Sequence, residues 1–343
     1  MNQKKHPIGR FFAVLGITLL CLLISLLGVI WVLERGPSPT VTGMFTRSVR
    51  ETSAIRWISN IFLSEEELND YKSVSTEDLA TESVNTSLIH VEKAAEKRES
   101  GSDQSESVKL IDIAEGTCKG KLLIVSDPKQ VILGTSDEFV KQPGLQLTDM
   151  VAKYDGLAGI NAGGFNDENG TGSGGIPQGI VIVNGKVIFG NDLTPYHLVG
   201  LDQDGILHVG SMNGREAVEN GIQWAVSFVT HDGLASSLII NGEIQHQNLG
   251  GGVNPRTALG QRDDGALLLL VLDGRSINTL GATMEDVVNI MLEYGAVNAG
   301  NLDGGSSSVM VYDGEIVNHC ASVTGPRRIP TGFIVLKEGV TYG

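Results

Sequence analysis

A carboxylate followed by two glycines and three serines lies near the end of the chain, in Asn298 to Ser308. Glycine has no Cβ, so Gly304 and Gly305 let a ligand approach the backbone N–H groups beside Asp303. A sharp turn in which Asp303 accepts backbone hydrogen bonds is the structural alternative. Such a turn does not need three successive serines, so the segment indicates a ligand site with Asp303 as its carboxylate.

A second glycine-rich segment, Ile160 to Asn166, also follows an apolar run. It lacks the G-x-x-x-x-G-K-[ST] spacing of a nucleotide-binding loop, so by itself it only weakly indicates a phosphate site.

Three arginine-bearing segments offer basic side chains. Arg256 begins a predicted strand and Arg275 follows the next one, so a hairpin brings both to the same edge of a sheet. Paired guanidinium groups suit a phosphate, to which each can donate two hydrogen bonds. An ion pair with Asp273 that braces the hairpin explains the spacing equally well. Arg327 and Arg328 form a third basic segment, which either binds an anionic ligand or pairs with an acidic residue of the chain.

Metal and nucleophile motifs are weak. The histidines show no H-x-H or H-x-x-x-H pattern, and no G-x-S-x-G elbow occurs. No required cofactor is predicted, although Asp273 and Asp303 with nearby carbonyl oxygens suit Ca²⁺ or Mg²⁺. Cys118 and Cys320 either pair or remain separate small apolar residues, and the sequence slightly favours the second.

Hairpin signals dominate residues 109–337. Asn184-Gly185, Asn241-Gly242 and Asp313-Gly314 each lie between strand-like runs and supply the positive φ angles of two-residue turns. Residues 198–210 and 257–274 predict two further hairpins. Such a chain forms largely antiparallel or mixed β-sheets.

Two helices are predicted to pack on these sheets. They cover residues 147–154 and 284–294, the second with a capping box from Thr283 to Asp286 and a stop at Gly295. The expected fold class is α+β, in one domain over residues 109–343.

An uncharged apolar run covers residues 11–33, long enough to cross about 30 Å of hydrocarbon as one helix. Lys4, Lys5 and Arg10 precede it, which keeps residues 1–10 in the cytoplasm and places the rest of the chain outside. A cleaved signal peptide is the alternative, but the run is long for one and no clear cleavage site follows.

Residues 34–108 are rich in Ser, Thr and Glu, and predict an acidic flexible stalk with a transient helix near residues 90–98. The chain has 343 residues, with 25 Lys and Arg against 40 Asp and Glu, a net charge of −15. That balance excludes a nucleic-acid partner, which requires a basic surface.

Taken in order, INAGGF, NPRTALG, VLDGR, the T-M-E helix and NLDGGSSSVMVYDGEIVN resemble the phosphodiester glycosidase family over about residues 156–336. The resemblance implies hydrolysis of a sugar-1-phosphodiester, similar to a GlcNAc-1-phosphodiester, by an exopolysaccharide-associated surface protein. It implies a phosphorylated glycan as substrate, with Asp303 as first and Asp273 as second candidate for the catalytic carboxylate. The candidate substrate-binding residues are Asn161, Gly164, Phe165, Arg256, Thr257, Arg275, Asn301, Gly304, Gly305, Ser306 and Arg328.

Two other functions use the same residues. A non-catalytic module that binds anionic glycans during polymer export needs the same arginines and glycine loops. A metal-dependent phosphodiesterase would cut a P–O bond of the diester instead of the bond to the sugar carbon, with Asp273 and Asp303 as metal ligands.

Overall fold

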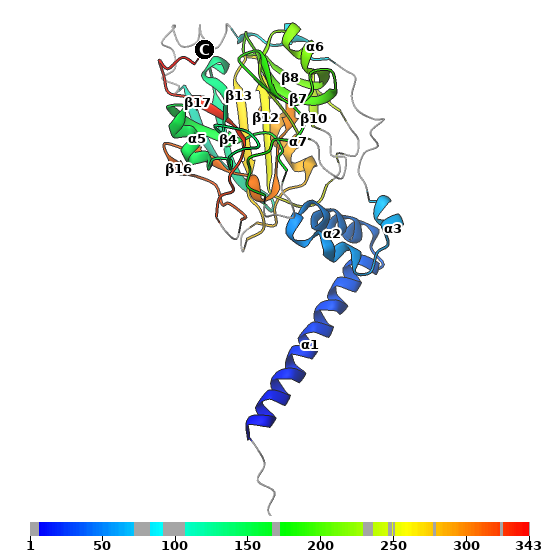
Figure 1. Ribbon diagram of the computed structural model, residues 1–343. Coiled ribbons are helices and arrows are strands. Elements are labelled where there is room, and N and C mark those ends of the chain that lie inside the picture. Colours follow the sequence, from blue (N-terminus) through cyan, green and yellow to red (C-terminus); the bar gives the residue numbers. More distant parts are fainter. Residues whose placement is uncertain are drawn as a thin grey trace, which may run out of the picture.

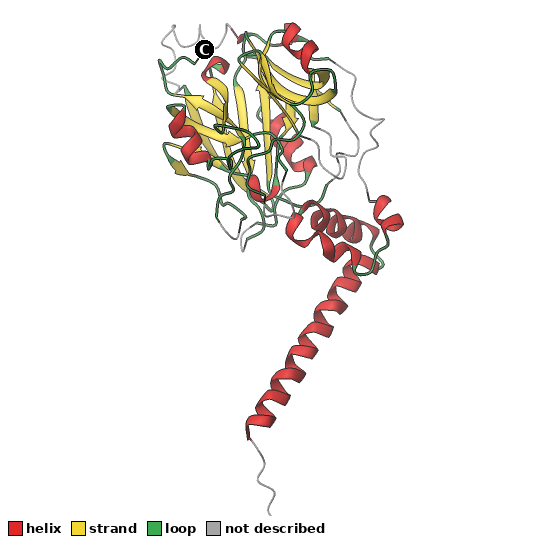
Figure 2. Ribbon diagram, in the orientation of Figure 1, coloured by secondary structure: helices red, strands yellow, loops and turns green. Residues whose placement is uncertain are grey.

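The computed structural model describes residues 7–71, 83–91, 107–166, 172–228, 236–245, 249, 251–276, 279–322 and 325–342. Three β-sheets form one domain, and a long helix, α1 (Pro7–Arg35), extends away from it (Figure 1). Figure 2 shows that strands make up most of the domain, with short helices at its edges.

The largest sheet has seven strands, and every neighbouring pair in it is antiparallel. Its order is β1 (Val108–Glu115), β2 (Cys118–Val125), β13 (Leu267–Leu272), β12 (Arg256–Arg262), β14 (Ala296–Asn301), β10 (Ser237–Ile240) and β11 (Glu243–Ile244). All six residues of β13 are buried. Alternate side chains of the run LLLLVL face opposite sides of the sheet. Both sides pack against apolar clusters, so the strand does not alternate apolar with polar residues.

Helix α7 (Met284–Glu293) covers one side of this sheet. Its buried Val287 and Met291 share a cluster with Leu268 and Leu270 of β13. On the other side, Leu269 belongs to a larger cluster that includes residues of both other sheets. One continuous apolar core therefore holds the three sheets together.

The two smaller sheets have five antiparallel strands each. One has the order β16 (Glu315–Ile316), β15 (Met310–Tyr312), β4 (Gly156–Asn161), β17 (Thr331–Leu336) and β3 (Val131–Thr135), with α5 (Leu147–Lys153) packed on it. The other has the order β6 (Lys186–Phe189), β5 (Val181–Val183), β9 (Ile222–Ser227), β7 (Pro195–Asp202) and β8 (Leu207–Asn213), with α6 (Gly214–Glu219) beside it. Short 3₁₀ helices η3 (Pro128–Gln130) and η5 (Gly305–Ser307) lie in the connections.

The predicted α+β fold built from hairpins is confirmed. Asn184, Asn241 and Asp313 have φ angles of 50°, 56° and 50° and turn the β5–β6, β10–β11 and β15–β16 hairpins. The β7–β8 and β12–β13 hairpins are also present. The capping box of Thr283 and Asp286 begins α7, and α5 lies where the first helix is predicted.

The structure differs from the sequence prediction between α1 and β1, where a flexible stalk is expected. The described residues there form α2 (Pro39–Glu51), η1 (Ser53–Asn60), α3 (Glu65–Asn69) and η2 (Thr86–Leu88). Helix α2 lies between α1 and the sheet domain (Figure 1). Polar contacts rather than an apolar stripe hold it there, which is why hydrophobic periodicity does not reveal it. The transient helix predicted near residues 90–98 falls mostly outside the described residues.

Candidate functional site

Asn161, the last residue of β4, joins three of the predicted motifs. Its side chain is 1% exposed, and its Nδ2 donates to the Asp303 carbonyl at 2.5 Å. Its Oδ1 accepts from the Thr257 hydroxyl at 2.9 Å and from the Val309 N–H at 3.0 Å. Both the Nδ2 and the Oδ1 of this buried amide are hydrogen-bonded within the protein, so Asn161 positions these segments and does not contact a ligand directly.

The Asp303 segment lies directly beside the start of β12. The Leu302 N–H donates to the Thr257 carbonyl at 2.9 Å, and the Gly305 N–H donates to the Pro255 carbonyl at 3.0 Å. A Cβ at position 304 would lie 2.9 Å from that same carbonyl oxygen, so only glycine fits there. The predicted convergence of these motifs is therefore present in the backbone.

Asp273 follows β13 at the same edge. Its Oδ1 accepts from the His319 N–H at 2.9 Å. Burial raises the pKa of the Asp273 carboxyl, and the His319 N–H partly opposes that shift. A carboxyl group of this kind retains a proton to higher pH than an exposed aspartate.

Arg327 is the basic residue that contacts Ser306. Its Nη1 donates to the Ser306 hydroxyl at 3.2 Å, and its guanidinium lies 5.4 Å from the centre of the Phe165 ring. Arg328, which we predicted for the site, donates to the Gly144 carbonyl at 3.2 Å instead. The sequence contains both arginines side by side and gives no means of choosing between them.

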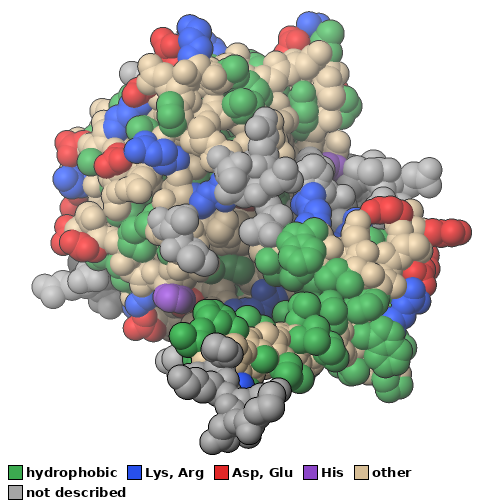
Figure 3. All heavy atoms as spheres, turned by 60° about the horizontal axis from the view of Figure 1, so that its bottom comes forward, with side chains coloured by type: hydrophobic (Ala, Val, Ile, Leu, Met, Phe, Trp, Pro, Cys, Tyr) green, Lys and Arg blue, Asp and Glu red, His purple; other side chains and the backbone are tan. Residues whose placement is uncertain are grey.

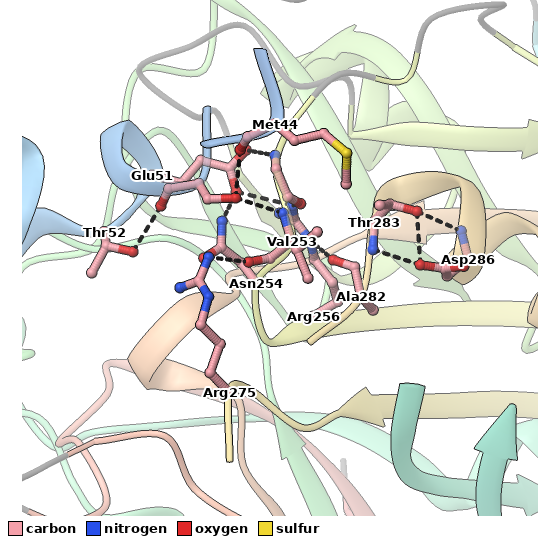
Figure 4. A network of polar contacts seen from close by, with 12 residues as sticks. Met44, Glu51, Thr52, Val253, Asn254, Arg256, Arg275, Ala282, Thr283 and Asp286 are labelled. Carbon is pink, nitrogen blue, oxygen red and sulfur yellow. Dashed lines mark hydrogen bonds and ion pairs between the residues drawn. The ribbon is translucent and has the colours of Figure 1, made fainter. Parts of the chain in front are cut away.

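Arg256 is buried, with 4% exposure, rather than open to solvent. It donates to the carbonyls of Gly252 and Ala282, and its Nη2 lies 2.9 Å from a carboxylate oxygen of Glu51 (Figure 4). We expected this guanidinium to hold a phosphate. In the structure a carboxylate of the chain itself takes that position.

Glu51, at the end of α2, receives further hydrogen bonds from the 252–254 loop. The Asn254 Nδ2 donates to it at 2.6 Å and the Gly252 N–H at 2.9 Å. One turn earlier, the Ser48 hydroxyl accepts from the Val253 N–H at 2.8 Å. Glu51 cannot be recognised from the sequence, because an isolated glutamate in a Ser- and Glu-rich segment does not differ from its neighbours.

Arg275 lies near the same loop, as the hairpin argument predicts. Its Nη2 donates to the Val253 carbonyl at 2.7 Å, and the residue is otherwise exposed. Although the residue as a whole is exposed, partial burial of its guanidinium against the loop lowers the pKa of Arg275, whereas the Glu51 carboxylate raises it and Arg256 lowers it again. Arg256, Arg275 and Glu51 therefore form one charged cluster at the C-terminal end of α2 (Figure 4).

The other predicted residues surround this edge. Asn301 is 2% exposed, and its Nδ2 has no hydrogen-bond partner among the described residues. A Cβ at position 164 would lie 2.9 Å from the Gln178 side chain, so Gly164 permits close packing. Cys118 and Cys320 are both free. Within the described residues no three His, Cys, Asp or Glu side chains gather as a metal cluster.

Comparisons with known proteins bear on the fold and the family of the chain. The zebrafish N-acetylglucosamine-1-phosphodiester alpha-N-acetylglucosaminidase catalytic domain, described as auto-inhibited by its pro-peptide, matches 69% of this chain and 85% of its own length. That match has a TM-score of 0.55 at 21% identity, so it shows a shared fold. A protein of Burkholderia pseudomallei K96243 named "Putative exported protein" matches 65% of this chain and 75% of its own length, with a TM-score of 0.46 at 16% identity.

A curated relative matches over a shorter stretch. The SPbeta prophage-derived uncharacterized protein YomE of Bacillus subtilis (strain 168) is 42% identical over 66 residues, 19% of this chain. The match spans only 10% of that relative's length. The model of the phosphodiester glycosidase family matches residues 154–336, more than half of the chain and all of the motifs described above. The chain therefore belongs to the phosphodiester glycosidase family.

Proposed function

We propose that this protein is a membrane-anchored glycosidase that hydrolyses a sugar-1-phosphodiester in a surface polysaccharide or glycolipid. Family membership supports the reaction class. Residues 8–35 form one helix long and apolar enough to cross a membrane. The basic residues before it favour a cytoplasmic N-terminus and an extracytoplasmic enzyme domain.

The observation that carries the proposal is the meeting of Asp303, Asp273 and Arg327 segments at one edge of the sheets. The Asn161 amide and the Gly305–Pro255 backbone bond hold this edge together. Two carboxyl groups and a guanidinium are groups that glycoside and phosphate chemistry require.

The chemistry needs little acid assistance, because the departing group is a phosphate monoester rather than a sugar alkoxide. We assign Arg327 and Arg275 to hold the phosphate oxygens, because the N–H groups of Asp303 and Gly305 already donate to carbonyls of the chain. The Asp303 carboxylate faces the sugar carbon as positive charge develops there. Asp273, with its raised pKa, is the second carboxyl group and the one suited to carry a proton.

The full chain in detergent, given a methyl diester of GlcNAc-1-phosphate, tests this assignment. We expect sugar release that falls about 100-fold or more in Asp303→Asn, the size of loss typical when one transition-state contact is removed. Asp313→Asn is the matched control, because this exposed hairpin-turn residue has a φ of 50°, which asparagine tolerates. Equal release by both variants would remove Asp303 from the mechanism.

The same assay distinguishes the alternative functions. Hydrolysis in ¹⁸O-labelled water places the label on the sugar if the glycosidic bond is cut, and on phosphate if the other bond is cut. Label on the phosphate, with activity lost in EDTA, would indicate a metal-dependent phosphodiesterase instead. Binding of the diester without any release would indicate a glycan-binding protein.

A further inference from the structure

The helices that follow α1 expose an apolar surface of their own. Val41 and Met44 of α2 and Trp57 of η1 are 49%, 39% and 65% exposed. Figure 3 shows hydrophobic side chains gathered over α1 and the segments next to it, beside a hollow in which basic side chains are visible. We call Val41, Met44 and Trp57 the apolar platform.

The arginines of this region are partly paired within the chain. Residues 35–60 contain four arginines and one acidic residue, and residues 61–70 add four acidic residues, a balance of 4 − 5 = −1 over residues 35–70. Arg35 pairs with Glu67 of α3, and Glu51 pairs with Arg256. Exposed aromatic and aliphatic side chains next to a membrane-spanning helix favour contact with the lipid surface.

The position of α2 along the chain brings it to that surface. Only residues 36–38 separate the end of α1 from the start of α2. Three extended residues reach about 10 Å, so α2 begins near the level at which the apolar span ends. Helix α2 has 13 residues, a length of about 20 Å. An interfacial helix with its apolar side towards the lipid satisfies these limits.

The far end of α2 is attached to the candidate site. Glu51 and Ser48 receive hydrogen bonds from the Gly252, Val253 and Asn254 loop, which leads directly into Arg256. A Cβ at position 252 would lie 2.2 Å from the Ser48 hydroxyl, so the loop and the helix are in direct contact. Whatever orients α2 therefore orients this edge of the sheets.

We infer that the apolar platform rests on the bilayer that α1 crosses and holds the candidate site against it, so that the substrate is a sugar-1-phosphodiester esterified to a membrane lipid. The substrate half of this inference rests on the proposed function. A lipid-linked diester keeps its phosphate at the height of the headgroups, within reach of a site held by one short helix. A soluble polymer would need no such platform.

Tryptophan fluorescence of the full chain tests the surface. On a Trp31→Phe background, Trp57 is the exposed tryptophan and Trp224, 8% exposed, is an internal reference. In vesicles of phosphatidylcholine and phosphatidylglycerol brominated near the headgroup, we expect at least a twofold loss of Trp57 emission. Adding Trp57→Phe should abolish this quenching.

A second tryptophan position supplies the control. Leu193 is 60% exposed, and its chain segment adjoins α6, at the end of the domain away from α1. On the Trp31→Phe, Trp57→Phe background, Leu193→Trp should show no lipid quenching. Lipid quenching at position 193 as strong as at position 57, or none at position 57, would overturn the inferred surface.

Turnover tests the substrate class separately. We expect the combined Val41→Ser, Met44→Ser and Trp57→Ser variant to hydrolyse a vesicle-borne, lipid-linked GlcNAc-1-phosphodiester about tenfold more slowly, and the soluble methyl diester at an unchanged rate. An equal loss on both compounds, or no loss on either, would overturn the substrate class. If the unmodified protein hydrolyses neither compound, the proposed function and the substrate class fail together, while the quenching result still decides the surface.

Discussion

The side-chain amide of Asn161 donates to the backbone carbonyl of Asp303 across 2.5 Å, joining residues 142 positions apart. This contact fixes the backbone of the proposed catalytic residue, while the other end of the amide holds Thr257 and Val309.

Replacing Asn161 should therefore damage stability and activity together. Asn161→Ala removes a hydrogen-bond partner of the Val309 N–H and of the Asp303 carbonyl, whereas the Thr257 hydroxyl keeps Ser308 at 3.2 Å. Each buried polar group left unsatisfied costs roughly 1–3 kcal/mol. We expect the free energy of unfolding to fall by about 3 kcal/mol or more, measured by denaturant titration. Asn220→Ala, at an exposed position, is the control and should change it little. A stability loss without any loss of activity would contradict the positioning role.

The Glu51–Arg256 pair should control the docking of α2. Both side chains are nearly buried, at 9% and 5% exposure, and removing one partner of a buried pair typically costs about 3–5 kcal/mol. Glu51→Ala should speed hydrogen exchange in residues 39–51. Arg256→Lys should speed it as well, because one ammonium group cannot replace the planar guanidinium. Glu66→Ala, at an exposed position of α3, should leave exchange unchanged. Unchanged exchange in Glu51→Ala would show that other contacts hold the helix.

Adjacent arginines give a matched test of phosphate binding. Arg327→Ala removes the guanidinium at Ser306, and loss of a charged hydrogen bond of about 1.5–3 kcal/mol corresponds to roughly a 10- to 100-fold rise in KM for the diester. Arg328→Ala removes only a contact to the Gly144 carbonyl and should change KM less than threefold. A larger rise in KM for Arg328→Ala than for Arg327→Ala would assign phosphate binding to Arg328 instead.

Asp273 should make stability depend on pH. Because burial raises its pKa in the folded protein, the folded state binds the proton more tightly than the unfolded state. Its contribution is fully present below the unfolded pKa of about 3.9 and is lost as pH rises through the folded pKa. Relative to the unmodified protein, Asp273→Asn should therefore gain in Tm between pH 4 and pH 7. If the difference in Tm between Asp273→Asn and the unmodified protein does not change with pH, the pKa of Asp273 is the same in the folded and unfolded states.

Cysteine reactivity should separate the two thiols that lie outside α1. Burial, the largest cause, raises the pKa of Cys118 to about 12, so its reactive thiolate is scarce at pH 8. Cys320 is partly exposed. An impermeant maleimide on intact cells should label the protein once, and Cys320→Ser should remove the label. Labelling only after the cells are opened would reverse the proposed orientation.

Local patterns predicted those parts of the fold that local chemistry determines. Asn-Gly and Asp-Gly pairs specify their hairpins through positive φ angles, and the Thr283 cap specifies where α7 begins. The expectation that the Asp303 segment meets the start of β12 comes from the family resemblance, because the spacing of the motifs along the chain does not show which of them meet. The choice between Arg327 and Arg328 depends on which side chain the preceding loop turns toward Ser306, which no spacing records.

The docking of α2 depends on long-range contacts that the sequence does not reveal. Glu51 is 205 residues from Arg256, and its segment has the polar composition of a linker. Only the folded 252–254 loop creates the set of donors that makes this glutamate distinctive.

The Glu51 carboxylate and an incoming anion would require the same donors on Arg256 and Asn254. Any phosphate that reaches those donors must displace Glu51 and so weaken the attachment of α2 to the domain. By thermodynamic reciprocity, whatever strengthens that attachment makes anion entry there less favourable by an equal amount. Anion occupancy of this position and the attachment of α2 to the sheet domain are thus coupled in one equilibrium.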